Sequence, residues 1–201
     1  MSISRLHIGR SWLPALVLSI LLLLFSGAAR AGEVEEVNPD LAAQLFLKIL
    51  SYDRNLSIRS GGRLVLAIVY RPDSPESDRI REGVQTAFQD RAGKFPVQGK
   101  TVSVTAVAFD AKTLTRRLQT AGATIIYVTP GLDDQTGSVI AAAQALKAPT
   151  LTGRRSLLDG GLAVAVVTNE DRPGIVINLP VAKALGMDLD PNLLRLAEVK
   201  R

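Results

Sequence analysis

The sequence predicts an α/β protein: a three-layer α/β/α sandwich on a mostly parallel sheet, with a C-terminal antiparallel hairpin at the sheet edge and a closing helix. Between residues 64 and 151, short apolar runs alternate with longer segments whose apolar residues recur at helical spacing. This alternation favours parallel strands joined by helices on both faces of a sheet. Near the C-terminus, Leu162–Thr168 and Gly174–Leu179 are separated only by a polar turn that contains Asp171 and Pro173. Such a short connection predicts a hairpin.

Residues 1–31 have the three parts of a secretory signal peptide. Arg5 and Arg10 form a positively charged start, Leu13–Phe25 is an apolar core, and residues 29–31 provide a small-x-small cleavage site. The apolar core is shorter than the roughly 20 residues that span a bilayer. We therefore expect cleavage after residue 31, and an uncleaved membrane anchor is the alternative.

A cleaved signal peptide without a twin-arginine motif implies Sec-type export to the periplasm. Because the chain contains no cysteine, a lipid-anchored lipoprotein is excluded. The mature protein would begin at Gly32, with a short flexible lead-in over residues 32–37 and a single domain over residues 38–201. A domain of this length can bury a sizeable core without disulfides.

The basic balance of the chain depends largely on the signal peptide. The formal net charge is +5, from 24 basic and 19 acidic residues. Without the three arginines of residues 1–31, 21 basic residues face 19 acidic ones and the net charge is +2. The tyrosines and phenylalanines are scattered singly, so no aromatic platform for stacking bases is present. We expect no nucleic-acid partner.

The first expected helix begins after Asn38, whose side chain can accept from the free amides of the first turn, and runs to about Tyr52. Five apolar side chains form two neighbouring rows along it: Leu41, Leu45 and Ile49 in one, Phe46 and Leu50 in the other. A stripe this wide exceeds what packing on one face of a sheet usually requires. Two interpretations remain open: a deeply packed helix, or a helix that contacts a protein partner through Leu45, Phe46 and Leu50.

The middle of the chain contains the rest of the alternation. Ser74 and Asp110 are each expected to cap the helix that follows their strand. The expected strands cover Leu64–Tyr70, Val102–Phe109, Thr124–Val128 and Pro149–Leu151, with a helix in each interval between them.

Two short helices are expected after the hairpin. The first is opened by Pro180 and ended by Gly186. The last is capped by Asp190, with Pro191 at the first helical position, where a missing N–H costs nothing. Its expected core-facing residues are Leu193, Leu196 and Ala197.

Beyond residue 31 the chain contains neither histidine nor cysteine, because its one histidine is His7. This excludes Ser-His-Asp and Cys-His nucleophiles, the usual zinc sites and thiol redox chemistry. P-loop, G-x-S-x-G and G-x-G-x-x-G motifs are absent. The adjacent acids at Asp133 and Glu170 lie where turns favour acids, so we interpret them as structural. We expect no enzyme activity, cofactor or metal site; a hydrolase with paired carboxylates or a Ser-Lys pair ranks last.

One candidate ligand site follows from the expected topology. In open α/β sheets, ligands bind beyond the carboxyl ends of the strands. The candidate residues at these ends are Tyr70, Arg71, Asp110, Thr129 and Arg154. Every fold of this class has such an edge, and these residues could instead only turn the chain. A small-solute-binding module that uses this cleft is the alternative function.

The C-terminal region resembles the YfiR-like family of small periplasmic proteins. The resemblance is carried by the order of an apolar strand, a turn, the segment IVINLPVAKALG (residues 175–186) and the segment LLRLAEV (residues 193–199). It implies a non-enzymatic regulator that binds and represses an inner-membrane diguanylate cyclase, lowering cyclic di-GMP and biofilm formation. It also implies a homodimer.

The chain departs from that family in two respects. Family members often carry cysteine pairs and a Trp-Pro after the first helix, whereas this chain has no cysteine and reads Ser51-Tyr52-Asp53-Arg54 there. Redox control is therefore not expected. The departure leaves another membrane sensor, such as a histidine kinase, open as the partner.

Overall fold

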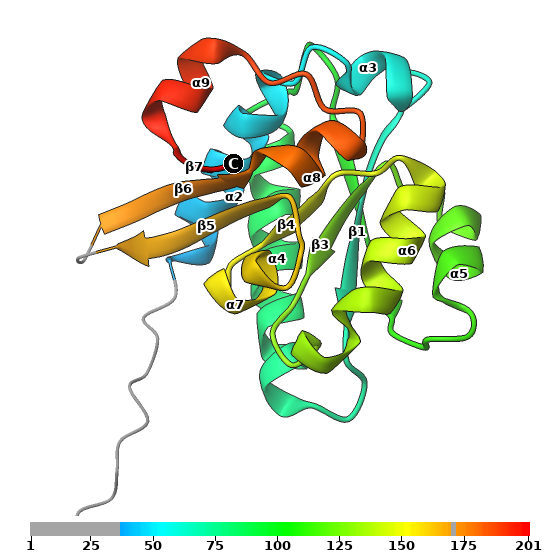
Figure 1. Cartoon of the computed structure of the whole chain (residues 1–201). Helices are drawn as coiled ribbons and strands as arrows, with labels where there is room; N and C mark the ends of the chain where they lie inside the picture. Colours follow the sequence, from blue (N-terminus) through cyan, green and yellow to red (C-terminus); the bar gives the residue numbers. More distant parts are fainter. Residues whose placement is uncertain (1–36, 170–171) are drawn as a thin grey trace, which may run out of the picture. The chain divides into compact units, whose positions relative to one another are not determined.

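The computed structural model of this chain describes residues 37–169 and 172–201 (Figure 1). The expected signal peptide, residues 32–36 of the expected lead-in and Asp171 of the expected hairpin turn lie outside the described residues. The elements in chain order are α2 (Pro39–Ser51), α3 (Leu56–Arg59), β1 (Leu64–Tyr70), α4 (Pro75–Ala92), β2 (Val102–Ala108), α5 (Leu114–Thr120), β3 (Ile125–Val128), the 3-10 helix η1 (Asp133–Gln135), α6 (Thr136–Leu146), β4 (Thr150–Thr152), α7 (Arg155–Asp159), β5 (Val164–Asn169), β6 (Arg172–Asn178), α8 (Leu179–Ala184), α9 (Pro191–Leu196) and β7 (Glu198–Lys200).

The described strands form a seven-stranded sheet in the order β2-β1-β3-β4-β5-β6-β7. Every neighbouring pair is parallel except β5 and β6, which form the antiparallel hairpin. In the β1–β2 pair, Leu64 lies opposite Val102 and Tyr70 lies opposite Ala108. The predicted α/β class, with a mostly parallel sheet and a C-terminal hairpin, is confirmed.

The prediction that the hairpin forms the sheet edge is wrong. The unexpected strand β7 pairs in parallel with β6 and is itself the last strand of the sheet. Three residues are too few for a periodicity to be recognised in the sequence. The hairpin is therefore an interior part of the sheet.

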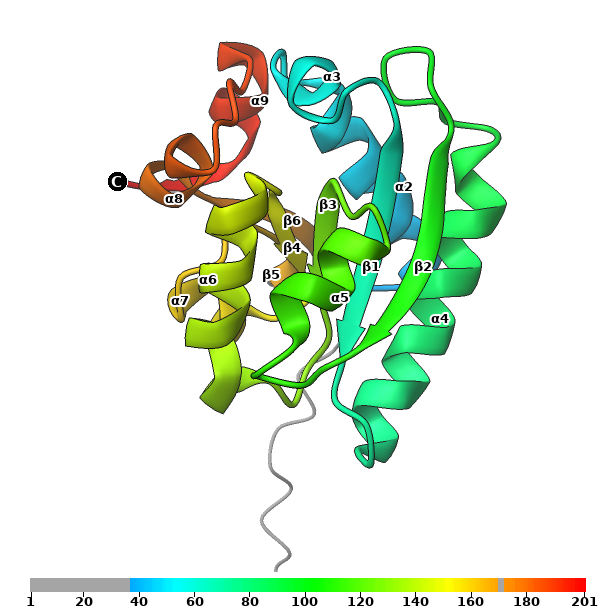
Figure 2. The same cartoon turned by 90° about the vertical axis from the view of Figure 1, so that its right-hand side faces the viewer.

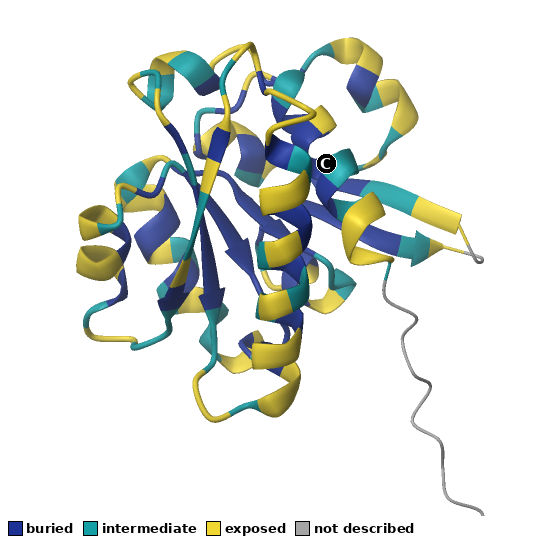
Figure 3. Ribbon diagram, turned by 180° about the vertical axis from the view of Figure 1, so that it is seen from behind, coloured by how far each residue is buried: buried dark blue, intermediate teal, exposed yellow. Residues whose placement is uncertain are grey.

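Helices cover both faces of the sheet. Figure 2 shows α2 and α4 on one face and α5 and α6 on the other. The central strands between these layers are buried, whereas the outward faces of the helices are exposed (Figure 3). This arrangement is the three-layer sandwich that the sequence predicts.

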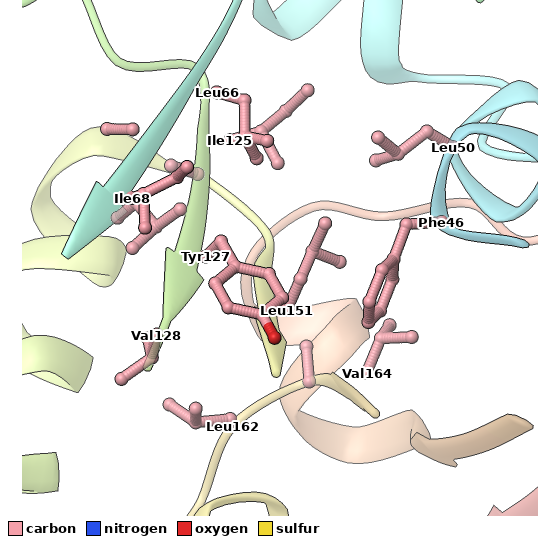
Figure 4. Packing of buried hydrophobic residues seen from close by; sticks show 14 of the residues in the cluster. Phe46, Leu50, Leu66, Ile68, Ile125, Tyr127, Val128, Leu151, Leu162 and Val164 are labelled. Atoms are coloured by element: carbon pink, nitrogen blue, oxygen red, sulfur yellow. The ribbon is translucent and has the colours of Figure 1, made fainter. Parts of the chain in front are cut away.

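An aromatic cluster joins the sheet to the α2–α4 layer. The rings of Phe46 in α2 and Phe88 in α4 lie 6.2 Å apart and are stacked. Tyr127 of β3 meets Phe46 edge-on at 5.8 Å (Figure 4). Such pairs contribute about 0.5–1.5 kcal/mol beyond the burial of their surface. The cluster fixes α2 against the centre of the sheet.

The starts of α2, α4 and α9 follow the expected capping chemistry, but the prediction for Asp110 is wrong, because α5 begins only at Leu114 with Thr113 as its N-cap residue. The Asn38 side chain accepts from the amides of Asp40 and Leu41, and Ser74 accepts from the amide of Ser77. Asp190 accepts from the amide of Asn192 at 2.8 Å. Each capped helix begins with proline, which has no amide to leave unpaired.

The last helix buries less than the sequence indicates. Leu193 is buried as expected, but Leu196 is 77% exposed. The helix ends at Leu196 because the chain then turns into β7. The prediction that Leu196 faces the core is therefore wrong.

Candidate functional site

The five residues predicted to line a ligand cleft lie where the parallel strands end. Tyr70 ends β1 and Arg71 follows it, whereas Asp110, Thr129 and Arg154 each follow the end of another strand. Because β2, β1, β3 and β4 are parallel neighbours, their carboxyl ends lie side by side at the same end of the sheet. What a ligand could contact there depends on the bonds that these side chains already make.

Thr129 belongs to a buried chain of hydrogen bonds. The amide of Arg71 donates to Ser77 Oγ at 2.8 Å, and Ser77 Oγ lies 2.7 Å from Thr129 Oγ1. Thr129 Oγ1 donates to the carbonyl of Val69 at 3.1 Å. Neither hydroxyl side chain is exposed. These hydrogen bonds connect the start of α4 to the ends of β1 and β3, so Thr129 has a structural role here.

Both arginines at these strand ends form ion pairs with acidic residues of nearby helices. Arg71 pairs with Asp134 in η1, and Arg154 pairs with Glu76 at the start of α4. Exposed pairs of this kind contribute about 0–1 kcal/mol. Their main effect is on position, because an anion would have to displace a carboxylate from each guanidinium.

Asp110 is engaged within its own turn. Its Oδ1 accepts from the hydroxyl of Thr113 at 2.7 Å and from the amide of Thr113 at 2.9 Å. The hydroxyl bond is the main reason that the pKa of Asp110 lies below its ordinary value. Gln135, followed by Arg71, likewise lowers the pKa of Asp134. Both carboxylates therefore stay ionised at neutral pH and already accept hydrogen bonds from the chain.

Little enclosed space remains at this end of the sheet. A cavity of about 70 Å³ lies between α2, α4 and the ends of β3 and β4, beside Tyr127 and Gly153. Ligand pockets usually measure about 300–1,000 Å³. A larger depression of about 520 Å³ lies open over the loop from Tyr70 to Asp78. The strand ends therefore present an open surface on which the hydroxyl of Thr129, the carboxylate of Asp110 and one nitrogen of each arginine are bonded within the protein.

The partner-binding residues predicted on α2 have different surroundings. Phe46 and Leu50 have no exposed surface, because both pack into the core beneath α2 (Figure 4). A sealed side chain cannot contact a partner, so the expectation for these two residues is corrected. Leu45 is half-buried and retains accessible surface.

A buried acid that the sequence reasoning did not single out joins the two ends of the described chain. Asp53 is completely buried, and its carboxylate pairs with Arg59 at 2.8 Å. It also accepts from the amides of Asn55 at 3.1 Å and Asp188 at 3.0 Å. Arg59 donates to the carbonyl of Gly186 at 2.7 Å. We call Asp53, Arg59 and these partners the Asp53 clasp.

The clasp lies where the sequence departs from the YfiR-like pattern at residues 51–54. That departure is the one signal that could have indicated it. The partners at Gly186 and Asp188 are more than a hundred residues away, so no local pattern pairs them with Asp53.

No group of acidic residues that could hold a metal ion occurs within the described ranges. In that same part of the chain, no helix combines the length and apolar character needed to cross a membrane.

The fold and these contacts define an α/β protein in which polar side chains at the strand ends bond to its own helices and turns. Residues 39–198 match the sequence profile of the YfiR/HmsC-like family, and the chain therefore belongs to this family. The match confirms the resemblance seen in the C-terminal region. Proteins of this family are periplasmic, non-catalytic regulators of membrane signalling.

Several solved structures share the fold. The ABC domain in complex with L-Trp from Streptococcus pneumonia matches 79% of this chain at 16% identity and a TM-score of 0.57. A conserved domain protein from Vibrio cholerae matches 81% at 15% identity and a TM-score of 0.58. The ligand-free, open substrate-binding protein CD0873 from Clostridium difficile matches 73% at 14% identity and a TM-score of 0.51.

The chain spans 60%, 60% and 57% of those three structures, respectively. At such low identity the likeness concerns the fold alone. No curated protein sequence matches the chain.

Proposed function

We propose that this protein is a periplasmic repressor that binds an inner-membrane diguanylate cyclase and thereby lowers cyclic di-GMP, without catalysing a reaction itself. The observation that carries the proposal is membership of the YfiR/HmsC-like family across residues 39–198. The contacts at the strand ends support it, because Arg71, Thr129 and Arg154 there are bonded to the protein's own residues.

Repression by binding needs only a difference in affinity. A protein that binds the inactive conformation of a receptor more tightly shifts the population toward it, and about 1.4 kcal/mol changes the ratio tenfold. The rigidly packed sandwich suits this role, since no conformational change of the repressor is required.

The outer surface of α2 is a proposed contact for the membrane partner. Leu45 is half-buried and Leu41, one turn earlier on the same row, is 38% exposed. These two side chains replace the wider set expected from the sequence.

The test begins with deletion of the gene, which should raise cellular cyclic di-GMP several-fold. Complementation with the wild-type gene should restore the low level, whereas Leu45→Glu should not. Leu196→Glu is the matched control, because it makes the same substitution at a side chain of α9 that is 77% exposed and lies outside α2. Melting curves must show that Leu45→Glu stays folded.

Unchanged cyclic di-GMP in the deletion strain, together with no membrane protein captured by the purified repressor, would refute the proposal. An unchanged messenger level with capture of a different membrane sensor would keep the regulatory class and change the partner. A homodimer is also part of the proposal, and sedimentation equilibrium tests it directly.

The alternative, a solute-binding module at the strand ends, has weaker support because Thr129, Arg71 and Arg154 already have partners. A thermal-shift screen with amino acids and small anions tests it. A stabilising solute whose effect disappears in Arg71→Ala would favour this alternative.

A further inference from the structure

The strand β2 forms one edge of the sheet and has an open side. It pairs only with β1 among the described strands, and it is seven residues long. An unpaired edge presents a row of free amides and carbonyls that can accept another strand. In Figure 2, β2 lies at the margin of the sheet with α4 on one face and α5 on the other.

The register shows which backbone groups of β2 point outward. The amide of Phe109 donates to the carbonyl of Tyr70 at 2.8 Å, so Phe109 faces β1. Because successive residues of a strand alternate in this direction, Ser103, Thr105 and Val107 also face β1. The groups that face away from the sheet therefore belong to Val102, Val104, Ala106 and Ala108.

The last carbonyl of this row already has a partner. The guanidinium of Arg117 donates to the carbonyl of Ala108 at 3.0 Å. The sequence of β2, VSVTAVA, contains no charged residue and no proline. Natural edge strands usually carry such residues, a bulge or a covering loop to prevent pairing. The lack of charge and proline in β2 makes this edge suited to adding a strand.

The surroundings of the edge indicate the charge of what it accepts. An open groove of about 380 Å³ lies between residues 105–108 of β2 and the α5 side chains Arg116, Arg117 and Thr120. Both arginines and the neighbouring Lys112 are exposed. The acidic neighbour Asp110 is half-buried and already bonded to Thr113. The rim is therefore net positive and complements an acidic segment.

A second copy of this chain fits the edge less well. Two β2 strands that pair in antiparallel fashion are related by a twofold axis perpendicular to the sheet, which places the α5 helices side by side on the same face. The two copies would then place two positively charged rims on the same face of the joined sheet. Like charges brought together in this way oppose association.

We propose that β2 binds an extended, acidic segment of a protein partner as an additional strand of the sheet. Backbone hydrogen bonds to Val104 and Ala106 provide the affinity, and Arg116 and Arg117 select acidic side chains beside the carboxyl half of β2. The inference rests on the proposed function for the existence of a protein partner, and it adds a second contact surface besides α2 and what that surface recognises.

The test uses an N-acetylated, C-amidated nonapeptide of alternating threonine and valine with two glutamates near one end. It is added to ¹⁵N-labelled protein expressed from the full-length gene, and amide hydrogen exchange is measured. The amides of Val104 and Ala106 should exchange at least tenfold more slowly. Those of Thr105 and Val107, which already face β1, should not change.

Two matched reagents separate strand pairing from charge attraction. A peptide N-methylated at alternate residues cannot pair and should not bind. A peptide with lysines in place of the glutamates should bind at least fivefold more weakly to the wild type, and Arg116→Glu should reduce that preference. Ala106→Pro removes one outward amide and should abolish binding, while the melting temperature falls by no more than about 4 °C.

Binding without protection of Val104 and Ala106, or equal binding of the two charge variants, would overturn the inference. Slow exchange of the same amides in concentrated protein without peptide would also overturn it, in favour of a second copy. Failure of the peptide while the membrane protein is still captured refutes only this inference. A bound peptide with unchanged cyclic di-GMP in the deletion strain refutes only the proposed function.

Discussion

The two edges of the sheet differ in almost every property that controls strand pairing. The β2 edge has seven residues, none of them charged, and backbone groups that face away from the sheet. The β7 edge has three residues, of which Glu198 pairs with Arg155 and Lys200 pairs with Asp159. Short, charged edges resist the addition of further strands.

This fold therefore protects the β7 edge against the addition of a strand and leaves the β2 edge open. At β7, the ion pairs attach the end of the chain to α7, so the charges both hold the strand and block the edge. At β2, the neighbouring charges lie on α5 and flank the open strand. The same side-chain chemistry therefore closes one edge and could select a partner at the other.

The largest expected effect concerns removal of the β7 edge. A chain that ends after Gly186 loses the buried side chains Met187, Leu189 and Leu193, each of which contributes about 2 kcal/mol. We expect an insoluble or protease-sensitive product in a solubility and limited-proteolysis assay. Removal of the exposed Arg201 alone is the control and should change nothing. A soluble truncated protein that melts cooperatively would show that the rest of the sheet folds without β7, and it would contradict this prediction.

The next effect concerns the Asp53 clasp, which holds the segment that leads to β7. Asp53→Ala leaves the Arg59 guanidinium, on a side chain that is 13% exposed, without its carboxylate, and it leaves two amides without their acceptor. The free energy of unfolding should fall by about 3–5 kcal/mol in urea denaturation. Asp188→Ala, at a side chain that is 51% exposed, should change it by less than about 0.5 kcal/mol. Equal effects of the two variants would contradict the clasp.

A smaller effect tests the direction of the β2 backbone groups. Val107→Pro removes an amide that faces β1 and should destabilise the protein by roughly 2 kcal/mol or more. Ala106→Pro removes an outward amide and should cost less than about 1 kcal/mol, because edge strands tolerate proline on their open side. Thermal melts of the two variants compare neighbouring positions of one strand. The reverse order would mean that the assigned open side is wrong.

The smallest effect concerns acid stability at the β7 edge. The hydrogen bond from Arg155 is the main reason that the pKa of Glu198 lies below its ordinary value of about 4.3. A carboxylate whose pKa is lowered in the folded protein stabilises the folded state at pH values above its pKa in the unfolded chain. This contribution disappears as the pH falls through the pKa of the folded protein. For this largely exposed pair it should stay below about 1 kcal/mol.

The melting temperature of Glu198→Gln should therefore lie slightly below that of the wild type from pH 7 to about pH 5, and the gap should close below about pH 4. Thermal melts across this range measure it. A gap that persists undiminished at the lowest pH would show that the ion pair is not its cause.

Sequence periodicity was enough to predict the α/β class, the strand–helix alternation and the capped starts of α2, α4 and α9. These features depend on local chemistry: apolar spacing, a capping side chain and a proline at the first turn. The C-terminal segments were enough to indicate the family. The strand β7 was missed because three residues carry no periodicity.

The candidate site was predicted less well, because its properties depend on long-range contacts. The sequence predicted that Arg71, Thr129 and Arg154 lie at the strand ends. It could not show that their hydrogen-bond and ion-pair partners would be Asp134, Ser77 and Glu76, respectively. A wide apolar stripe on α2 does not reveal which rows meet the sheet, and the structure seals Phe46 and Leu50.

Local sequence patterns specify most of the helices and strands and their order, since each follows from neighbours within a few turns. Long-range contacts establish which edge of the sheet is closed, which acid is buried and which residues remain accessible to a partner. Those outcomes depend on pairs such as Asp53 with Asp188 and Arg155 with Glu198, which lie far apart in the chain and meet only once the sheet has formed.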